Sequence, residues 1–137
     1  MQFMQRGDKI TKYIEYEILN HRVLRHPLVI QFKEAFLTKD HICIVMEYAN
    51  GGTMFSYVSE AGRLREADAQ WFFQQLILGI DYCHRKGIVN RDIKLENLLL
   101  MKVPNQRPCI KLCDFGYSKH DSGGAPETKV GTLACEY

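Results

Sequence analysis

The chain has 137 residues, of which 46% are apolar, enough for one domain with a sizeable core, so a disordered tail is excluded. Eighteen Lys and Arg against sixteen Asp and Glu give a formal charge of +2, too balanced for a protein that binds a nucleic-acid backbone. Its longest apolar stretch, residues 71–80, is too short to span a bilayer, and the first residues lack the apolar region of a signal peptide. Five cysteines without a CxxC pair favour a reducing compartment over a disulfide framework. We therefore expect no nucleic-acid partner, no membrane association, and a cytoplasmic or nuclear location.

Apolar residues recur with helical spacing near the N-terminus, at Ile10, Ile14 and Ile18. The spacing predicts an amphipathic helix that carries Glu17 beside its apolar stripe and ends near Pro27. Two β-rich runs follow, residues 28–37 and 42–46, and the polar turn between them predicts a hairpin. The second run is apolar throughout, so we expect a buried strand.

Two further helices are predicted in the middle of the chain. A break at Gly51 and Gly52 precedes Thr53, the expected N-cap of a short helix that ends at about Gly62. The longest predicted helix follows and ends at Gly87. We expect it to lie centrally and to present a wide apolar face, because spacings of four and three separate Ala69, Phe73, Leu76, Ile80 and Cys83.

Short strands are predicted after this helix, at residues 98–101 and 109–113. In the second strand, Ile110 and Leu112 are expected to point inward and Lys111 outward. From Ser118 the chain becomes polar, and the Ser-Gly-Gly-Ala-Pro segment at residues 122–126 predicts a flexible loop.

The most informative segment spans residues 89–97, Val-Asn-Arg-Asp-Ile-Lys-Leu-Glu-Asn, and is followed seventeen residues later by Asp-Phe-Gly at 114–116. The two segments resemble the catalytic loop and the metal-binding triplet of eukaryotic protein kinases. With each residue type at about one in twenty, four fixed residues arise by chance in ~10⁻³ of such chains, and the triplet within a short downstream window arises in another ~10⁻³. Coincidence at ~10⁻⁶ is too rare to explain the pair.

The resemblance implies an incomplete bilobal kinase fold of the α+β class, with part of the small lobe, the hinge and the first part of the helical large lobe. Residues 1–48 would form part of the N-lobe, with helix C and the strands after it. Residues 49–137 would form the hinge and part of the C-lobe, through the activation loop.

Phosphoryl transfer needs the triphosphate and the acceptor hydroxyl held in line and the developing charge neutralised, so carboxylate and amide side chains must converge. By resemblance, Asp92 would accept the proton of the substrate hydroxyl, and Lys94 would lie close to the transferring phosphate. Asn97 and Asp114 would hold two Mg²⁺ ions, which prefer oxygen ligands. The implied cofactors are ATP and Mg²⁺. The lysine two residues after Asp92 is the serine/threonine-kinase pattern, so the implied partner is a protein substrate with such hydroxyls.

Residues 44–52, Ile-Val-Met-Glu-Tyr-Ala-Asn-Gly-Gly, resemble the strand and hinge that connect the two kinase lobes. The resemblance makes Met46 the gatekeeper and assigns recognition of the adenine edge to the backbone of Glu47 and Ala49. Glu17 falls where the family has the helix-C glutamate that pairs with a strand lysine. The plain alternatives are a buried strand that ends in a glycine turn and a solvated helix charge.

Regulation by loop phosphorylation is implied by Arg91, because a guanidinium group binds an added phosphate through two hydrogen bonds. Thr128 occupies the usual activating position, and Thr132 resembles the loop threonine that contacts the catalytic aspartate. An upstream kinase or phosphatase is therefore an expected partner. A threonine in a polar loop without such a role is the alternative.

Several further segments, most specifically Asp-Phe-Gly-Tyr-Ser-Lys at 114–119, are similar to plant sucrose-non-fermenting-related kinases of subfamily two. This is the osmotic-stress and abscisic-acid branch, so the resemblance implies a role in stress signalling.

The chain also departs from the kinase pattern. Neutral Gln2 stands near the position of the strand lysine, and neither a glycine-rich phosphate loop nor an Ala-Pro-Glu segment is present. Asn90 stands where His or Tyr normally packs beneath Phe115, and its amide needs hydrogen-bond partners if it is buried. We therefore expect roughly the middle half of a kinase domain, with little or no turnover in isolation.

Two alternatives to a kinase segment remain at this point. A truncated pseudokinase would act as a non-catalytic module that binds a nucleotide or a protein, as Gln2 and Asn90 suggest. An unrelated small α+β interaction domain would instead place Asp92, Asn97 and Asp114 apart.

Overall fold

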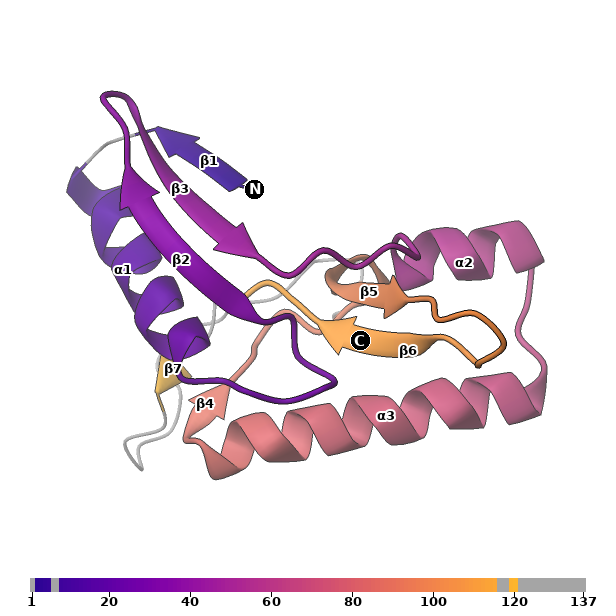
Figure 1. Cartoon of the computed structure of the whole chain (residues 1–137). Helices are drawn as coiled ribbons and strands as arrows, with labels where there is room; N and C mark the ends of the chain where they lie inside the picture. The colour runs from indigo at the N-terminus through magenta and orange to yellow at the C-terminus, as the bar shows by residue number, and fades with distance from the viewer. Residues whose placement is uncertain (1, 6–7, 116–118, 121–137) are drawn as a thin grey trace.

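The structure is a computed structural model that describes residues 2–5, 8–115 and 119–120 (Figure 1). The strands are β1 (Gln2–Gln5), β2 (Phe32–Leu37), β3 (His41–Met46), β4 (Ile88–Val89), β5 (Leu98–Met101), β6 (Cys109–Leu112) and β7 (Lys119–His120). The helices are α1 (Asp8–Arg22), α2 (Met54–Ala61), α3 (Glu66–Arg85) and the single 3-10 turn η1 (Leu95–Asn97). The predicted loop at residues 122–126 lies outside the described residues.

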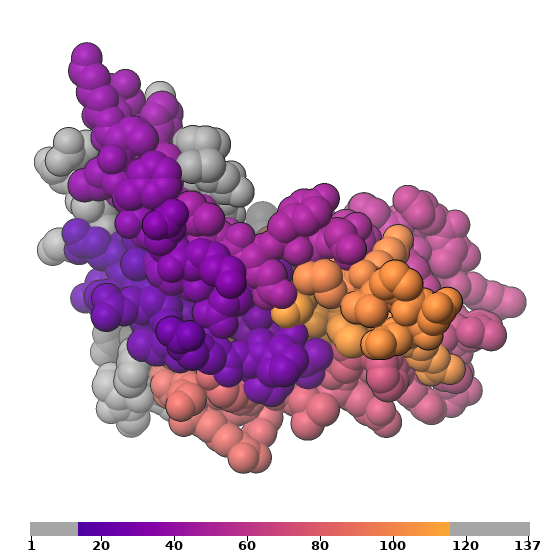
Figure 2. All heavy atoms as spheres, viewed as in Figure 1, coloured from indigo at the N-terminus to yellow at the C-terminus, as the bar shows by residue number. Residues whose placement is uncertain are grey.

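The N-terminal layer is an antiparallel sheet in the order β1-β3-β2, with α1 packed beside it (Figure 1). This confirms the predicted hairpin, whose tip projects from the body of the molecule in Figure 2. The central strand β3 is buried at Ile42, Cys43 and Ile44, as predicted. A small core forms where Ile14 of α1 meets this strand. Strand β1, which the hydrophobic pattern did not predict, completes the sheet.

The segment between α1 and β2 differs from the prediction. Helix α1 ends at Arg22 rather than near Pro27, and β2 begins at Phe32 rather than at Leu28. Residues 28–30 pair with β6 instead, through hydrogen bonds from Ile30 N to Leu112 O at 2.9 Å and from Leu112 N to Leu28 O at 2.8 Å. The partner strand lies about 80 residues farther along the chain, so local periodicity could not reveal this pairing.

Helix α2 has the predicted start and end. The Thr53 hydroxyl oxygen accepts a hydrogen bond from Ser56 N at 3.1 Å, and Gly62 ends the helix with φ +71°. Just before it, the Gly51 backbone lies against β5, with Gly51 N donating to Leu100 O at 2.7 Å. A Cβ atom on Gly51 would lie 2.6 Å from that carbonyl oxygen, so the close approach requires glycine.

Helix α3 is the longest helix, as predicted, but its buried face is turned by about one residue. Phe73 is 62% exposed, whereas Phe72, Gln75 and Gly79 are buried. Cys83 is buried as predicted, and Leu76 and Ile80 pack against the core. Leu112 packs against the Gly79 backbone, and the Gln75 side chain accepts a hydrogen bond from Ile110 N at 3.0 Å. The hydrophobic pattern gave neither the glycine nor the glutamine any weight, which explains the error.

The expectation of a central position for α3 is also wrong. Figure 1 shows α3 along one side of the molecule, with the β5–β6 hairpin on its inner face. This hairpin, α2 and α3 enclose the larger core, which includes Leu98, Leu100, Ile110, Leu112 and Phe115.

The predicted orientation of Lys111 in β6 is wrong. Its neighbours Ile110 and Leu112 are buried as predicted, but Lys111 is itself only 9% exposed. Glu47 binds its ammonium group from the other face of the strand. Strand alternation assumes one solvated face, and here both faces are covered.

The α+β class is confirmed. The division into partial lobes at residues 48 and 49 stays a prediction. No helix in the described part of the chain combines the length and apolar character needed to cross a membrane.

Candidate active site

The segment between β4 and η1 brings three of the predicted catalytic and metal-binding residues together. Asp92 is 7% exposed, and its Oδ2 atom lies 2.8 Å from Lys94 Nζ. Asn97 Nδ2 donates to the same carboxylate oxygen and to the Asp92 carbonyl, both at 2.9 Å. The tight turn of η1 therefore folds the side chain of Asn97 back onto Asp92.

Lys94 is held charged beside this carboxylate. Its hydrogen bond to Asp92 outweighs partial desolvation and, with the negative charges of Asp92, Asp114 and Glu96, raises the pKa of Lys94. The ammonium group thus lies within electrostatic range of Asp114 as well, where a cation would attract a phosphoryl oxygen.

Asp114 comes from a second turn, just after β6, and hydrogen bonds join this turn to the first. Cys113 N donates to Asn97 O at 3.2 Å, and Asn90 Nδ2 donates to Asp114 O at 3.0 Å. Asp114 has the left-handed backbone conformation, with φ +60°, which aspartate tolerates better than most residues. Burial, together with the Asp114 charge, raises the pKa of Cys113 to about 12, so its thiol stays protonated.

The predicted metal ligands provide few protein oxygens. Among residues 2–5, 8–115 and 119–120, no group of three or more His, Cys, Asp and Glu side chains gathers around one point. Asn97 uses its Nδ2 atom on Asp92, so its Oδ1 atom is the end that remains for a metal ion. An amide oxygen and a nearby carboxylate suit Mg²⁺, which keeps several waters and takes its other ligands from substrate phosphates.

Phe115 connects this region to α1 through His21, a residue that the sequence reasoning did not single out. The two ring centroids lie 4.7 Å apart, and His21 Nε2 donates to Ile30 O at 2.6 Å. Burial outweighs this backbone hydrogen bond and lowers the pKa of His21, so the ring is neutral at pH 7. Helical spacing could have revealed it, because His21 is four residues after Glu17 and seven after Ile14.

Glu17 lies on the inner face of α1 and is 6% exposed. Burial, and then the nearby negative charge of Asp114, raise its pKa from 4.5 to about 7. Within the described part of the chain, neither of these two causes of the raised Glu17 pKa is a positively charged group. Gln2, which the sequence resemblance places near the family's strand lysine, pairs with Ile44 in the sheet.

The predicted hinge residues lie at the end of β3. Met46 packs against the small core. The two carboxylate oxygens of Glu47 lie 2.8 and 2.9 Å from Lys111 Nζ, and one also accepts a hydrogen bond from Gln31 N at 3.1 Å. Glu47 N donates to Gln31 O at 2.8 Å. The adenine contacts of the Glu47 and Ala49 backbone stay predictions.

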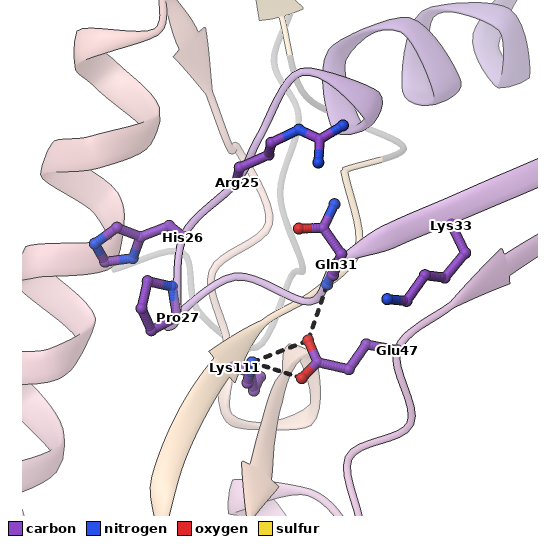
Figure 3. A pocket seen from close by; sticks show the side chains of 7 residues that line it. All are labelled: Arg25, His26, Pro27, Gln31, Lys33, Glu47 and Lys111. Carbon is purple, nitrogen blue, oxygen red and sulfur yellow. Dashed lines mark hydrogen bonds and ion pairs between the residues drawn. The ribbon is translucent and has the colours of Figure 1, made fainter.

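An open cavity of about 360 Å³ lies beside the Glu47 carboxylate (Figure 3). It is lined by Arg25, His26, Pro27, Gln31, Lys33, Glu47 and Lys111. Glu47 belongs also to the predicted hinge, but Asp92, Asn97 and Asp114 do not line the cavity. This cavity is therefore distinct from the cluster around Asp92.

The predicted regulatory residues are only partly within the described region. Arg91 is half-buried between Asn90 and Asp92. Thr128 and Thr132 lie outside the described residues, so their assigned roles stay predictions.

Residues 2–135 match the protein kinase domain family. Serine/threonine-protein kinase SRK2H of Arabidopsis thaliana is 53% identical over 135 residues, which are 98% of this chain and 37% of that protein. SRK2A of Physcomitrium patens and SAPK5 of Oryza sativa subsp. japonica, also named serine/threonine-protein kinases, are each 50% identical over 135 residues. Those alignments cover 98% of this chain and 38% and 36% of the two relatives. The chain thus spans less than two-fifths of the length of these relatives.

Proposed function

Because this chain belongs to the protein kinase domain family, we propose that it is a segment of a serine/threonine kinase that transfers the γ-phosphoryl group of ATP to protein hydroxyls. The names of its relatives support serine and threonine as acceptors. Membership of the family removes the hypothesis of an unrelated small α+β interaction domain.

The cluster around Asp92 is the observation that carries this proposal. Lys94 and Asn97 hold one carboxylate oxygen of Asp92 by hydrogen bonds of 2.8 and 2.9 Å. Asp92 would accept the proton of the substrate hydroxyl and aim its oxygen, and Lys94 would stabilise negative charge on the transferring group. Most of the rate enhancement in this class of reaction comes from such positioning and charge stabilisation.

Asn97 and Asp114 are the residues that would hold Mg²⁺. The ion, when bound, would neutralise the triphosphate charge. The backbone of Glu47 and Ala49 would orient the adenine, and Met46 would border it.

The biological setting is part of the same proposal. The similarity to plant kinases supports a role in stress signalling, with phosphorylation at Thr128 by an upstream kinase and its removal by a phosphatase. Arg91 would bind the added phosphate, and Thr132 would contact Asp92. The balanced charge of the chain argues against a nucleic-acid partner, and its five cysteines without a CxxC pair support a location in the cytoplasm or nucleus.

A truncated pseudokinase is the second candidate, and the surroundings of Glu17 favour it. A buried carboxyl with a pKa of about 7 is the state expected when its usual lysine partner is replaced by neutral Gln2. The chain would then bind a nucleotide or a protein without transferring phosphate.

A chimaera tests the proposal, with residues 2–135 replacing the matching segment of an Arabidopsis relative. A kinase segment supports transfer of labelled phosphate from ATP to a substrate protein, and Asp92→Asn lowers the rate by ~10²–10⁴. Asp81→Asn, at an exposed carboxylate on α3, is the matched control and should leave the rate unchanged.

The two candidates give different outcomes in this assay. A chimaera that is silent until Gln2→Lys is introduced identifies the pseudokinase. Transfer that survives Asp92→Asn would remove the catalytic assignment. The 137-residue chain on its own is expected to show Mg²⁺-dependent nucleotide binding with little or no turnover.

A further inference from the structure

Asn90 uses both ends of its side-chain amide on the backbone of residues in the candidate active site. Its Nδ2 atom donates to Asp114 O at 3.0 Å, and its Oδ1 atom accepts from Asp92 N at 2.9 Å. A backbone N–H can only donate and a carbonyl can only accept, so these two partners determine which way the amide faces. Asn90 therefore joins the two turns that carry Asp92 and Asp114.

The hydrogen bond from Asn90 to Asp114 O acts on a residue whose backbone conformation is uncommon. Asp114 has φ +60°, a region that residues other than glycine adopt infrequently. A donor on its carbonyl oxygen fixes the plane of the following peptide, and with it the direction in which the Asp114 side chain leaves the backbone. Loss of that donor would let the peptide rotate.

A further connection between the two turns runs through Cys113 and Asn97. Cys113 N and Cys113 Sγ both donate to Asn97 O at 3.2 Å, one residue before Asp114. The hydrogen bonds of Asn90 Nδ2 and Cys113 N flank the Cys113–Asp114 peptide, so loss of the Asn90 bond should also weaken the Cys113 bond. Asn90 is a connection that a substitution can remove while the backbone elements stay intact.

We propose that Asn90 is a positioning residue that holds the backbones of Asp92 and Asp114 in the arrangement needed to bind Mg²⁺ and nucleotide. The role of Asn90 in binding Mg²⁺ and nucleotide rests on the proposed function. Its role in joining the two turns rests on the geometry around Asn90. The residue that departs from the kinase pattern would thereby serve the site rather than disable it.

Amide hydrogen exchange in the unliganded chain tests whether Asn90 joins the two turns. Asn90→Leu, which removes donor and acceptor at similar volume, should speed exchange of the Asp92 and Cys113 amides at least tenfold. Asn90→Asp keeps the acceptor for Asp92 N but puts an oxygen against Asp114 O, so it should speed exchange at Cys113 and spare Asp92. Asn90→His, with one donor and one acceptor nitrogen, should restore both rates.

Asn50 offers a matched control, because it also makes two backbone hydrogen bonds with its side-chain amide. Its Nδ2 atom donates to Lys102 O at 3.1 Å, and its Oδ1 atom accepts from Lys102 N at 2.8 Å. Asn50→Leu should leave exchange at Asp92 and Cys113 unchanged. Thermal unfolding of every variant shows whether it is folded at the temperature of measurement.

Calorimetric titration with ATP at a series of Mg²⁺ concentrations tests whether Asn90 supports the binding of Mg²⁺ and nucleotide. Asn90→Leu and Asn90→Asp should raise the Mg²⁺ concentration for half-maximal ATP binding about tenfold, whereas Asn90→His should not. An unchanged Cys113 exchange rate in Asn90→Leu overturns the proposal. So does faster exchange with an unchanged Mg²⁺ requirement, which would make Asn90 a structural residue only. Failure of the unsubstituted chain to bind ATP would count against the proposed function and against this role in binding, while the exchange rates would still decide whether Asn90 joins the turns.

Discussion

At the scale of single residues, Glu17 has the environment that most alters its chemistry. It is buried on α1, and its pKa is raised to about 7 by burial and by the charge of Asp114. The folded chain therefore holds this proton more tightly than the unfolded chain does. The resulting stabilisation is fully present below pH 4.5 and is lost as the pH rises through about 7.

Glu17→Gln should remove this pH dependence, because the amide is neutral throughout. The free energy of unfolding of the variant, relative to the unsubstituted chain, should rise by up to about 3 kcal/mol between pH 4.5 and pH 8. Urea unfolding at several pH values measures this difference. Glu15→Gln, at an exposed position on the same helix, is the control and should follow the unsubstituted chain. Parallel pH profiles for Glu17→Gln and the unsubstituted chain would contradict the assignment.

At the scale of elements, the ion pair between Lys111 and Glu47 ties β6 to the end of β3. Lys111 is buried and Glu47 is partly buried, so water screens this pair less than an exposed one. Burial by itself raises the pKa of Glu47, but the hydrogen bonds and charge of Lys111, with the Gln31 amide, outweigh it and lower that pKa. The pair thus stabilises a contact between two strands that share no hydrogen-bonded ladder.

Lys111→Met should lower the free energy of unfolding by about 1–3 kcal/mol at pH 7, because the Glu47 carboxylate loses its cation in a partly buried position. The double variant with Glu47→Gln should recover part of that loss. Because the pKa of Glu47 is lowered, the contribution should disappear as the pH falls below the ordinary range of a glutamate. Urea unfolding of the four chains of this cycle gives the coupling energy.

The exposed pair of Arg85 and Asp81 is the control for that cycle. Arg85→Met should leave stability unchanged within error, because exposed ion pairs contribute little. Equal effects at Lys111 and Arg85 would show that burial adds nothing to the Lys111 pair.

At the scale of the whole molecule, the outer face of α3 exposes adjacent apolar side chains. Phe73, Ile77 and Leu78 are each about half or more exposed, although the helix buries its other face against β6. Monomeric proteins rarely expose large contiguous apolar patches, which promote association. The longer relatives contain further chain, and the 137-residue chain by itself should use this face to associate.

Sedimentation equilibrium should show concentration-dependent association of the 137-residue chain in the micromolar range. Replacing Phe73 and Leu78 by glutamate should shift the chain toward the monomer, because charge cannot be buried in such a contact. The control replaces Tyr16 and Leu19, which are exposed on α1, by glutamate in the same way. A shift toward the monomer in the α1 variant and not in the α3 variant would place the contact on α1 and contradict this prediction.

The sequence by itself determined the features whose causes lie within a few residues of each other. These include the β2–β3 hairpin, the Thr53 cap of α2 and the length of α3, because turn chemistry, capping and periodicity are local. The spacing of Asp92, Lys94 and Asn97 likewise lies within one turn. The family resemblance added Asp114 to this group. Periodicity could not show that Asp114 lies beside Asp92, Lys94 and Asn97.

Only the tertiary structure decided the partners that come from distant parts of the chain. Lys111 is buried because Glu47 reaches it, and residues 28–30 pair with β6 rather than extending β2. Asn90, which departs from the family pattern, finds one partner 24 residues away and so bridges two turns. The physical reason is the same in these cases. Burial and hydrogen bonding depend on which surfaces meet in space, and a local sequence pattern does not show which residues will pack against it.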